Sequence, residues 1–170
     1  MTREDLERIV IEFMNSFTTV NLACVQGEEP WAAAVYYARQ GFDLIFFSSP
    51  GSRHSTAFSE NARAAATIHG DYKGWREIKG LQMEGTVERI KGVRAQARAL
   101  ATYLKRYPFA REFLSHPSAL SPSVALKMAK VALYRFRPTT ILYMDNEQGF
   151  GTRRKLNIEN GKAVGDADLG

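Results

Sequence analysis

Residues 44–67 read LIFFSSPGSRHSTAFSENARAAAT, a pattern of strand, turn, helix and strand. An apolar run ends at a Pro-Gly turn, and Ser52 is placed to cap a helix that extends to Asn61. Arg53 and His54 then occupy the first helical turn, where the helix dipole normally favours acidic side chains. Two explanations stay open from these residues alone. Either a bound anion is held there by helix N–H groups, serine hydroxyls and Arg53, or the helix is an ordinary capped surface helix with Arg53 in solvent.

Short β-type runs precede this stretch. Residues 17–25, 31–39 and 42–48 are joined by links short enough for hairpins, which predicts an antiparallel meander. The second run, WAAAVYYAR, has small residues where a strand usually carries branched ones. Such residues let another group approach the backbone closely, or they pack tightly against a helix.

The chain after residue 61 continues the same β-rich pattern. A long run over residues 76–90 contains Gly80 and Gly85, and isolated glycines in a strand are typical of bulges or of a curved barrel. Apolar spacing predicts a helical excursion over residues 93–114, after which β-type runs return. The Asn-Gly pair in LNIENGKAV predicts a further hairpin. We therefore expect an α+β fold in one domain, residues 1–170, whose antiparallel sheet closes into a barrel with flanking helices.

The two ends of the chain carry their own expectations. The N-terminal residues have helical spacing and no apolar core of a signal peptide, and no apolar run is long enough to cross a membrane. A soluble, cytoplasmic protein is therefore expected. Residues 165–170 are expected to form a loose tail.

Charge and cysteine content narrow the class of function. The formal net charge is +5, and residues 86–137 hold 11 basic and 2 acidic side chains. This basic stretch indicates either an anionic partner or a solvated helix face, and nucleic acid is not expected because no nucleic-acid-binding motif accompanies it. Cys24, the single cysteine, lies in a β-branched apolar run, which favours a buried, inert thiol over a nucleophile.

Familiar catalytic motifs are absent from the sequence. There is no nucleophile elbow, P-loop, dinucleotide fingerprint or H-E-x-x-H pair. The histidines, His54, His69 and His116, are far apart and lack cysteine partners, so no metal site is expected.

Several segments together carry a family resemblance over about two-thirds of the chain. They are PWAAAVYYA, LIFFSSPGSRHSTAFSENARAAAT, WREIKGLQMEGTVERI and RFRPTTILYMDNEQGFGTRRKL. They resemble the FMN-binding split-barrel family related to pyridoxamine 5′-phosphate oxidase, in particular a small bacterial branch. The resemblance implies an FMN-dependent oxidoreductase, similar to a flavin reductase or an oxidase, that acts on a small-molecule redox substrate. It also implies a homodimer with FMN at the subunit interface.

The resemblance implies site residues position by position. The strand laid along the flavin ring would supply Ala33, Ala34, Val35 and Tyr36. The ribityl-phosphate would be flanked by Phe47 and Ser48, and the phosphate held by Ser52, Arg53 and His54. Polar contacts to the ring would come from Lys79, Gly80 and Gln82. The second subunit or the substrate side would contribute Trp75, Phe150 and Arg153.

Two departures from the family pattern matter. His54 stands where the family usually has lysine, so phosphate binding should depend on pH. The C-terminal arginine motif of true pyridoxamine 5′-phosphate oxidases is missing, so that activity itself is not expected. Two alternatives stay open. One is a split barrel that binds haem, with His54 or His69 as axial ligand, or deazaflavin. The other is a non-enzymatic flavin-binding or regulatory module whose basic stretch, residues 89–137, binds an acidic partner or nucleic acid.

Overall fold

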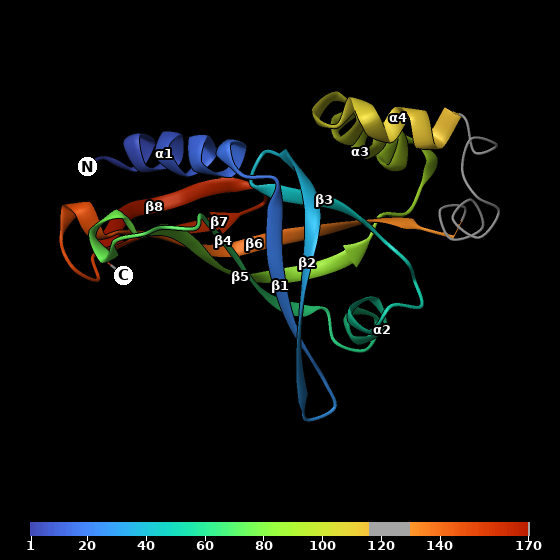
Figure 1. The fold of residues 1–170 in the computed structure, drawn as a ribbon, viewed down its shortest axis with the longest axis horizontal. Coiled ribbons are helices and arrows are strands. Elements are labelled where there is room, and N and C mark those ends of the chain that lie inside the picture. Colours follow the sequence, from blue (N-terminus) through green and yellow to red (C-terminus); the bar gives the residue numbers. More distant parts are fainter. Residues whose placement is uncertain (116–129, 170) are drawn as a thin grey trace.

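The computed structural model describes residues 1–115 and 130–169, in which eight strands form one antiparallel sheet (Figure 1). The strand order is β3-β2-β1-β4-β5-β6-β7-β8. The strands are β1 (Thr19–Gln26), β2 (Glu29–Gln40), β3 (Asp43–Ser48), β4 (Arg63–His69), β5 (Lys79–Arg89), β6 (Ala132–Asp145), β7 (Arg153–Glu159) and β8 (Lys162–Leu169).

A second pairing closes this sheet into a barrel. Strand β3 pairs with β6 from Leu44↔Phe136 to Ser48↔Ala132, so that six strands meet edge to edge while β7 and β8 continue beyond them. This pairing covers the edge of β3 that an open meander would leave exposed. The expected α+β fold, a split barrel with flanking helices, is confirmed.

Helices cover three parts of this sheet. The first, α1 (Arg3–Ser16), begins with a capping box between Thr2 and Asp5 and lies against β7 and β8. Helix α2 (Arg53–Glu60) lies beside the β1–β2 hairpin, and α3 (Val93–Arg106) with α4 (Pro108–Ser115) lies over β2 and β3 (Figure 1). Short turns η1 (Trp75–Glu77) and η3 (Asn146–Gln148) adjoin one another at the far end of the sheet from α2. None of the helices in the described ranges is long and apolar enough to cross a membrane.

Alternation along the strands separates an inner from an outer face. In β1, Leu22 and Cys24 are buried in the barrel core, whereas Asn21 and Ala23 point outward. Burial raises the pKa of the Cys24 thiol, which keeps it protonated and unreactive. The prediction of a buried, inert cysteine agrees with this position.

Strand β6 runs unbroken through Pro138, although proline usually interrupts the middle of a sheet strand. Proline donates no ladder hydrogen bond, and it is accommodated because the register shifts between Glu84 and Gly85 directly opposite. A Cβ added at Gly85 would overlap the carbonyl oxygen of Arg137 and lie 2.9 Å from the Cα of Pro138. Gly85 is therefore required by the close approach of the two backbones.

The C-terminal hairpin corrects one expectation. Residues 165–170 were expected to be a loose tail, but residues 165–169 belong to β8, which pairs with β7 as far as Arg154↔Leu169. Residue 170 lies outside the described residues. Asn160 and Gly161 both have positive φ, 51° and 75°, as the predicted Asn-Gly turn requires. Arg3 also donates to the carbonyl oxygen of Gly165 at 3.4 Å. Ladder bonds and this contact with α1 together hold the segment in the sheet.

Candidate functional site

The N-terminus of α2 is built as the sequence predicts. Ser52 has extended dihedral angles and its hydroxyl accepts a hydrogen bond from the backbone N–H of Ser55 at 3.4 Å. Because first-turn N–H groups have no intrahelical acceptor, those of Arg53 and His54 remain available. Strand β3 ends at Ser48, immediately before the turn, which brings Ser48 next to the cap.

Three hydroxyls and an imidazole form a compact cluster at this helix end. We call Ser48, Ser52, His54 and Ser55 the serine–histidine cluster. Ser52 donates to Ser55 at 2.9 Å, and Ser55 donates to Ser48 at 3.0 Å. The Ser48 hydroxyl lies 2.6 Å from Nε2 of His54. Ser48 and Ser55 are buried, whereas Ser52 and His54 are half-buried. Ser55 was missed by sequence reasoning, because its only signal is its place three residues after the cap.

His54 is held in its neutral form in this cluster. Burial lowers the pKa of the imidazole below its ordinary value, and no described carboxylate opposes that effect. Nε2 can then accept the hydrogen bond of the Ser48 hydroxyl. A neutral ring also avoids repulsion from the positive end of the helix dipole.

Arg53 points to the β1–β2 hairpin rather than to the serine–histidine cluster. Its Nη2 donates to Glu29 Oε2 at 2.8 Å, and the guanidinium lies 4.5 Å from the ring centre of Trp31. The pair is open to water, since the side chains of Arg53 and Glu29 are 38% and 78% exposed. Arg53 therefore differs from the arginine of an ordinary surface helix, which would lie free in solvent. Its charge is balanced by a carboxylate 24 positions earlier in the chain.

The strand of small residues lies beside this helix end. Strands β2 and β3 pair at Tyr37↔Phe46, so the residues expected along the flavin ring are next to Phe47 and Ser48. On β2, Ala34 and Tyr36 are exposed, while Ala33 and Val35 are half-buried. Aromatic side chains of the α3–α4 region cover part of this area. Their ring contacts are Tyr107 with Tyr36 at 5.7 Å and Tyr103 with Phe47 at 4.9 Å.

The expected ring contacts on β5 lie elsewhere in the same molecule. Strands β1 and β4 separate β2 from β5, which places Gln82 roughly 14 Å from Ala34 in one cross-strand row. Lys79 is engaged by Glu147 at 2.6 Å and lies 3.9 Å from Asp145. Those carboxylates raise the pKa of Lys79, which keeps it cationic.

Trp75 and Phe150 form an exposed aromatic pair at the opposite end of the sheet. Their rings are edge to face at 5.6 Å, and the side chains are 53% and 82% exposed. Buried Asn146 fixes both loops: its amide donates to the carbonyl oxygen of Trp75 at 2.7 Å and its Oδ1 accepts from the N–H of Gly151 at 3.1 Å. Arg153, at the start of β7, is exposed nearby. One copy of the chain therefore separates the expected site residues into two groups.

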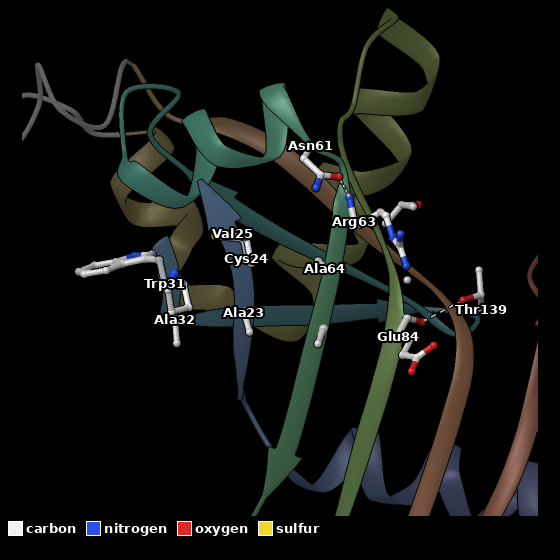
Figure 2. A pocket seen from close by; sticks show the side chains of 14 residues that line it. Ala23, Cys24, Val25, Trp31, Ala32, Asn61, Arg63, Ala64, Glu84 and Thr139 are labelled. Carbon is white, nitrogen blue, oxygen red and sulfur yellow. Dashed lines mark hydrogen bonds between the residues drawn. The ribbon is translucent and has the colours of Figure 1, made fainter. Parts of the chain in front are cut away.

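An open groove crosses the sheet from Trp31 on β2 to Thr139 on β6 (Figure 2). Its volume is about 910 Å³. Figure 2 shows small side chains on its floor and larger ones at its rim. Alanines of three neighbouring strands, Ala23, Ala32 and Ala65, lie opposite one another on the floor, and the larger residues Trp31, Arg63 and Glu84 also line the groove. Because the floor is made of alanines, the backbone of three strands is accessible to a flat partner.

His69 and the described part of the basic stretch form no second cluster. Among the described residues no group of three His, Cys, Asp or Glu side chains could hold a metal ion. His69 lies at the exposed end of β4, with Nε2 3.4 Å from Asn21 Nδ2 and Nδ1 3.2 Å from the carbonyl oxygen of Gly70. His116 and residues 116–129 of the basic stretch lie outside the described residues.

Part of the basic stretch serves the fold itself. Arg106 donates to the backbone carbonyl oxygens of Asn15 and Phe17 at 2.9 and 2.6 Å. Arg135 and Arg137 lie 3.3 and 3.7 Å from one carboxylate oxygen of Asp43. Burial raises the pKa of Asp43, so the two guanidinium groups offset an otherwise unfavourable buried charge.

The closed antiparallel barrel with two added strands defines a split-barrel protein. The capped N-terminus of α2, with its serine hydroxyls, arginine and histidine, is a candidate anion site. The family model described as pyridoxamine 5′-phosphate oxidase matches residues 7–144. The chain belongs to this family. A relative named UPF0306 protein, from Klebsiella pneumoniae (strain 342), is 29% identical over 133 residues, 76% of this chain and 79% of that protein.

Solved structures show the same fold at low sequence identity. Campylobacter jejuni ChuZ matches with a TM-score of 0.72 and 16% identity, over 96% of this chain and 63% of that one. A heme binding protein from Mycobacterium smegmatis matches with a TM-score of 0.65 and 18% identity, over 85% of this chain and 55% of that one. The chain thus spans between about half and two-thirds of these two proteins, and at this identity the likeness concerns the fold alone.

Proposed function

We propose that the protein binds FMN, with the phosphate at the N-terminus of α2 and the ring beside β2. The observation that carries the proposal is the serine–histidine cluster, which gathers hydroxyl and N–H donors where a helix dipole favours an anion. Family membership over residues 7–144 supports the same ligand class. The single free thiol of Cys24 suits a reducing, cytoplasmic setting.

The residues at this helix end fit a phosphate dianion. The Ser52 hydroxyl and the N–H groups of Arg53 and His54 are neutral donors, and the Arg53 guanidinium would turn from Glu29 to reach the same anion. His54 would supply a second cation once protonated. When bound, the isoalloxazine of FMN supplies electron or hydride transfer, and the protein binds and orients it. This division of roles explains why the chain needs no catalytic nucleophile of its own.

We also propose that the complete site needs two copies of the chain. The outward side chains of β1, β2 and β4 are small and exposed, among them Asn21, Ala23, Ala34 and Ala65. Such a flat face lets a second sheet approach closely. A partner copy would bring its own Lys79–Gln82 segment or its Trp75–Phe150 pair to the ring, which a single copy holds apart from the cluster.

The activity that fits this site is that of an FMN-dependent oxidoreductase acting on a small molecule. Oxidation of pyridoxamine 5′-phosphate is not proposed, because the C-terminal arginine motif for that substrate is missing from the sequence.

Flavin retention by an arginine variant tests the phosphate assignment. Arg53→Ala should weaken FMN binding roughly tenfold or more, since a charge-assisted hydrogen bond contributes about 1.5–3 kcal/mol. Arg94→Ala is the matched control, because Arg94 is an exposed arginine in the first turn of α3 with no ion pair to any described residue. The measurement is the visible spectrum after FMN is added and the excess removed. Stoichiometric flavin on Arg53→Ala would contradict the assignment.

Haem is the second candidate, because the similar mycobacterial structure is named a heme binding protein. Of the two histidines considered as axial ligands, His54 has its Nε2 occupied by Ser48, whereas His69 lies on the exposed sheet face. Haem produces a Soret band and flavin does not, so the same absorption spectrum distinguishes the two cofactors. A Soret band with no flavin bands would transfer the proposal to haem.

A further inference from the structure

We infer that Glu29 is an internal competitor for the anion site and thereby sets how tightly a phosphate is held at α2. This inference rests on the proposed function, because it concerns the same phosphate. In the structure Glu29 engages Arg53 away from the serine–histidine cluster: it accepts a hydrogen bond from Arg53 Nη2 at 2.8 Å, and the guanidinium rests on Trp31 at 4.5 Å. The pair joins the first turn of α2 to the β1–β2 hairpin.

The direction of the Arg53 side chain makes Glu29 a competitor rather than a support. Within the described parts of the chain, Arg53 makes no hydrogen bond to Ser48, Ser52 or His54, whose contacts are with one another. Arg53 and His54 are consecutive helical residues, so their side chains leave α2 in directions about 100° apart. To reach a phosphate beside Ser52, the guanidinium must turn away from the hairpin and exchange Glu29 for the ligand.

Trp31 positions the Arg53 guanidinium before this exchange. It lies beside the alanine-lined groove and is 40% exposed, and its ring supports the guanidinium from below. A cation over an exposed indole is held weakly enough to be released. The Glu29 carboxylate is likewise well exposed, so the ion pair is of the weak surface type. The contact therefore tunes affinity without blocking the site.

The expected change in affinity follows from the strength of that pair. Removing the carboxylate charge should tighten FMN binding by roughly 1.5- to fivefold, which is the range of an exposed ion pair expressed as a binding ratio. Riboflavin has no phosphate, so its binding should not change. Both ligands carry the same ring, and a difference between them isolates the phosphate.

The test compares Glu29→Gln with Glu28→Gln. Glu28 is the neighbouring exposed residue on the same hairpin and has no ion pair with any described residue, so both substitutions raise the net charge by one. Dissociation constants for FMN and riboflavin are measured by titration calorimetry for the wild type and both variants. The inference is supported if only Glu29→Gln tightens FMN binding and leaves riboflavin binding unchanged.

Other outcomes separate the inference from the proposed function. Equal FMN affinity of the two variants would overturn the inference while leaving FMN binding intact. Weaker FMN binding by Glu29→Gln would overturn it too, because Glu29 would then orient Arg53 for the ligand. If Glu29→Gln binds FMN and neither the wild type nor Glu28→Gln does, both the inference and the proposed function are supported. If none of the three proteins binds FMN, both are overturned.

Discussion

FMN binding should take up a proton at His54, and its affinity should therefore fall as pH rises. Burial lowers the pKa of this imidazole in the free protein, so the ring is neutral near pH 7. A bound phosphate dianion favours the imidazolium and raises the pKa in the complex. Between these two pKa values the dissociation constant should increase with pH, by at most about tenfold per pH unit for one proton.

The pH window for this experiment lies above the second ionisation of the phosphate. That ionisation falls near pH 6, so FMN is a dianion from about pH 6.5 to pH 8. His54→Lys should bind with little pH dependence across this range, because lysine stays protonated, and His54→Gln should bind weakly and equally at all pH values. Calorimetry in buffers of different ionisation enthalpy reports the number of protons taken up. Zero uptake by the wild type, or an unchanged pH slope in His54→Gln, would refute the reasoning.

The stability of the ligand-free protein should depend on pH in the opposite sense. Because the folded-state pKa of His54 is lowered, the unfolded chain binds the proton more readily. The stabilising contribution of the neutral ring is therefore present above the ordinary histidine pKa, near 6.5, and is lost as pH falls through the lowered value. Acid should weaken the free fold while strengthening the FMN complex, a combination that a general acid effect on folding would not produce.

Two further variants test the barrel and the proposed dimer. Gly85→Ala should lower the unfolding free energy by about 2 kcal/mol and the Tm by about 4–8 °C, because the new Cβ overlaps the Arg137 carbonyl. Gly51→Ala, where a Cβ meets no atom within 4 Å, should leave the Tm unchanged, and equal thermal unfolding of the two would contradict this account. Ala65→Glu on the exposed sheet face should convert a dimer into a monomer in light scattering. Ala101→Glu, exposed on α3, should not, and an unchanged dimer in Ala65→Glu would refute the proposed interface.

Local chemistry is what the sequence predicts well in this chain. Ser52 caps α2 and Asn160–Gly161 turns a hairpin, because both devices depend on a few consecutive residues. The continuity of β6 through Pro138 could not be predicted, since it depends on a bulge at Thr139 of β6, opposite Glu84 and Gly85. The end of β8 could not be predicted as a strand either, because its polar residues near the chain end resemble a loose tail and their pairing with β7 is not visible in the sequence.

The electrostatics of the candidate site depend on contacts that no local pattern contains. The sequence places Arg53 at a helix end but gives no sign that Glu29 would meet it, because the pair forms only when the β1–β2 hairpin folds back beside α2. The lowered pKa of His54 likewise comes from burial by the assembled barrel. The sequence points to Arg53 and His54 as candidates, whereas their charge state and partners required the fold.

The Arg53–Glu29 ion pair and the burial of His54 explain how α2 can begin with an arginine and a histidine in the free protein. The Arg53 charge is offset by Glu29, and His54 carries none, so neither cation opposes the helix dipole. A phosphate at the same place would reverse both arrangements: Arg53 leaves Glu29, and His54 gains a proton. Each of these two changes costs free energy and therefore weakens the net binding of the anion. A site balanced in this way would hold FMN less tightly than one whose arginine is unpaired and whose second cation is permanent, and its affinity would respond to pH.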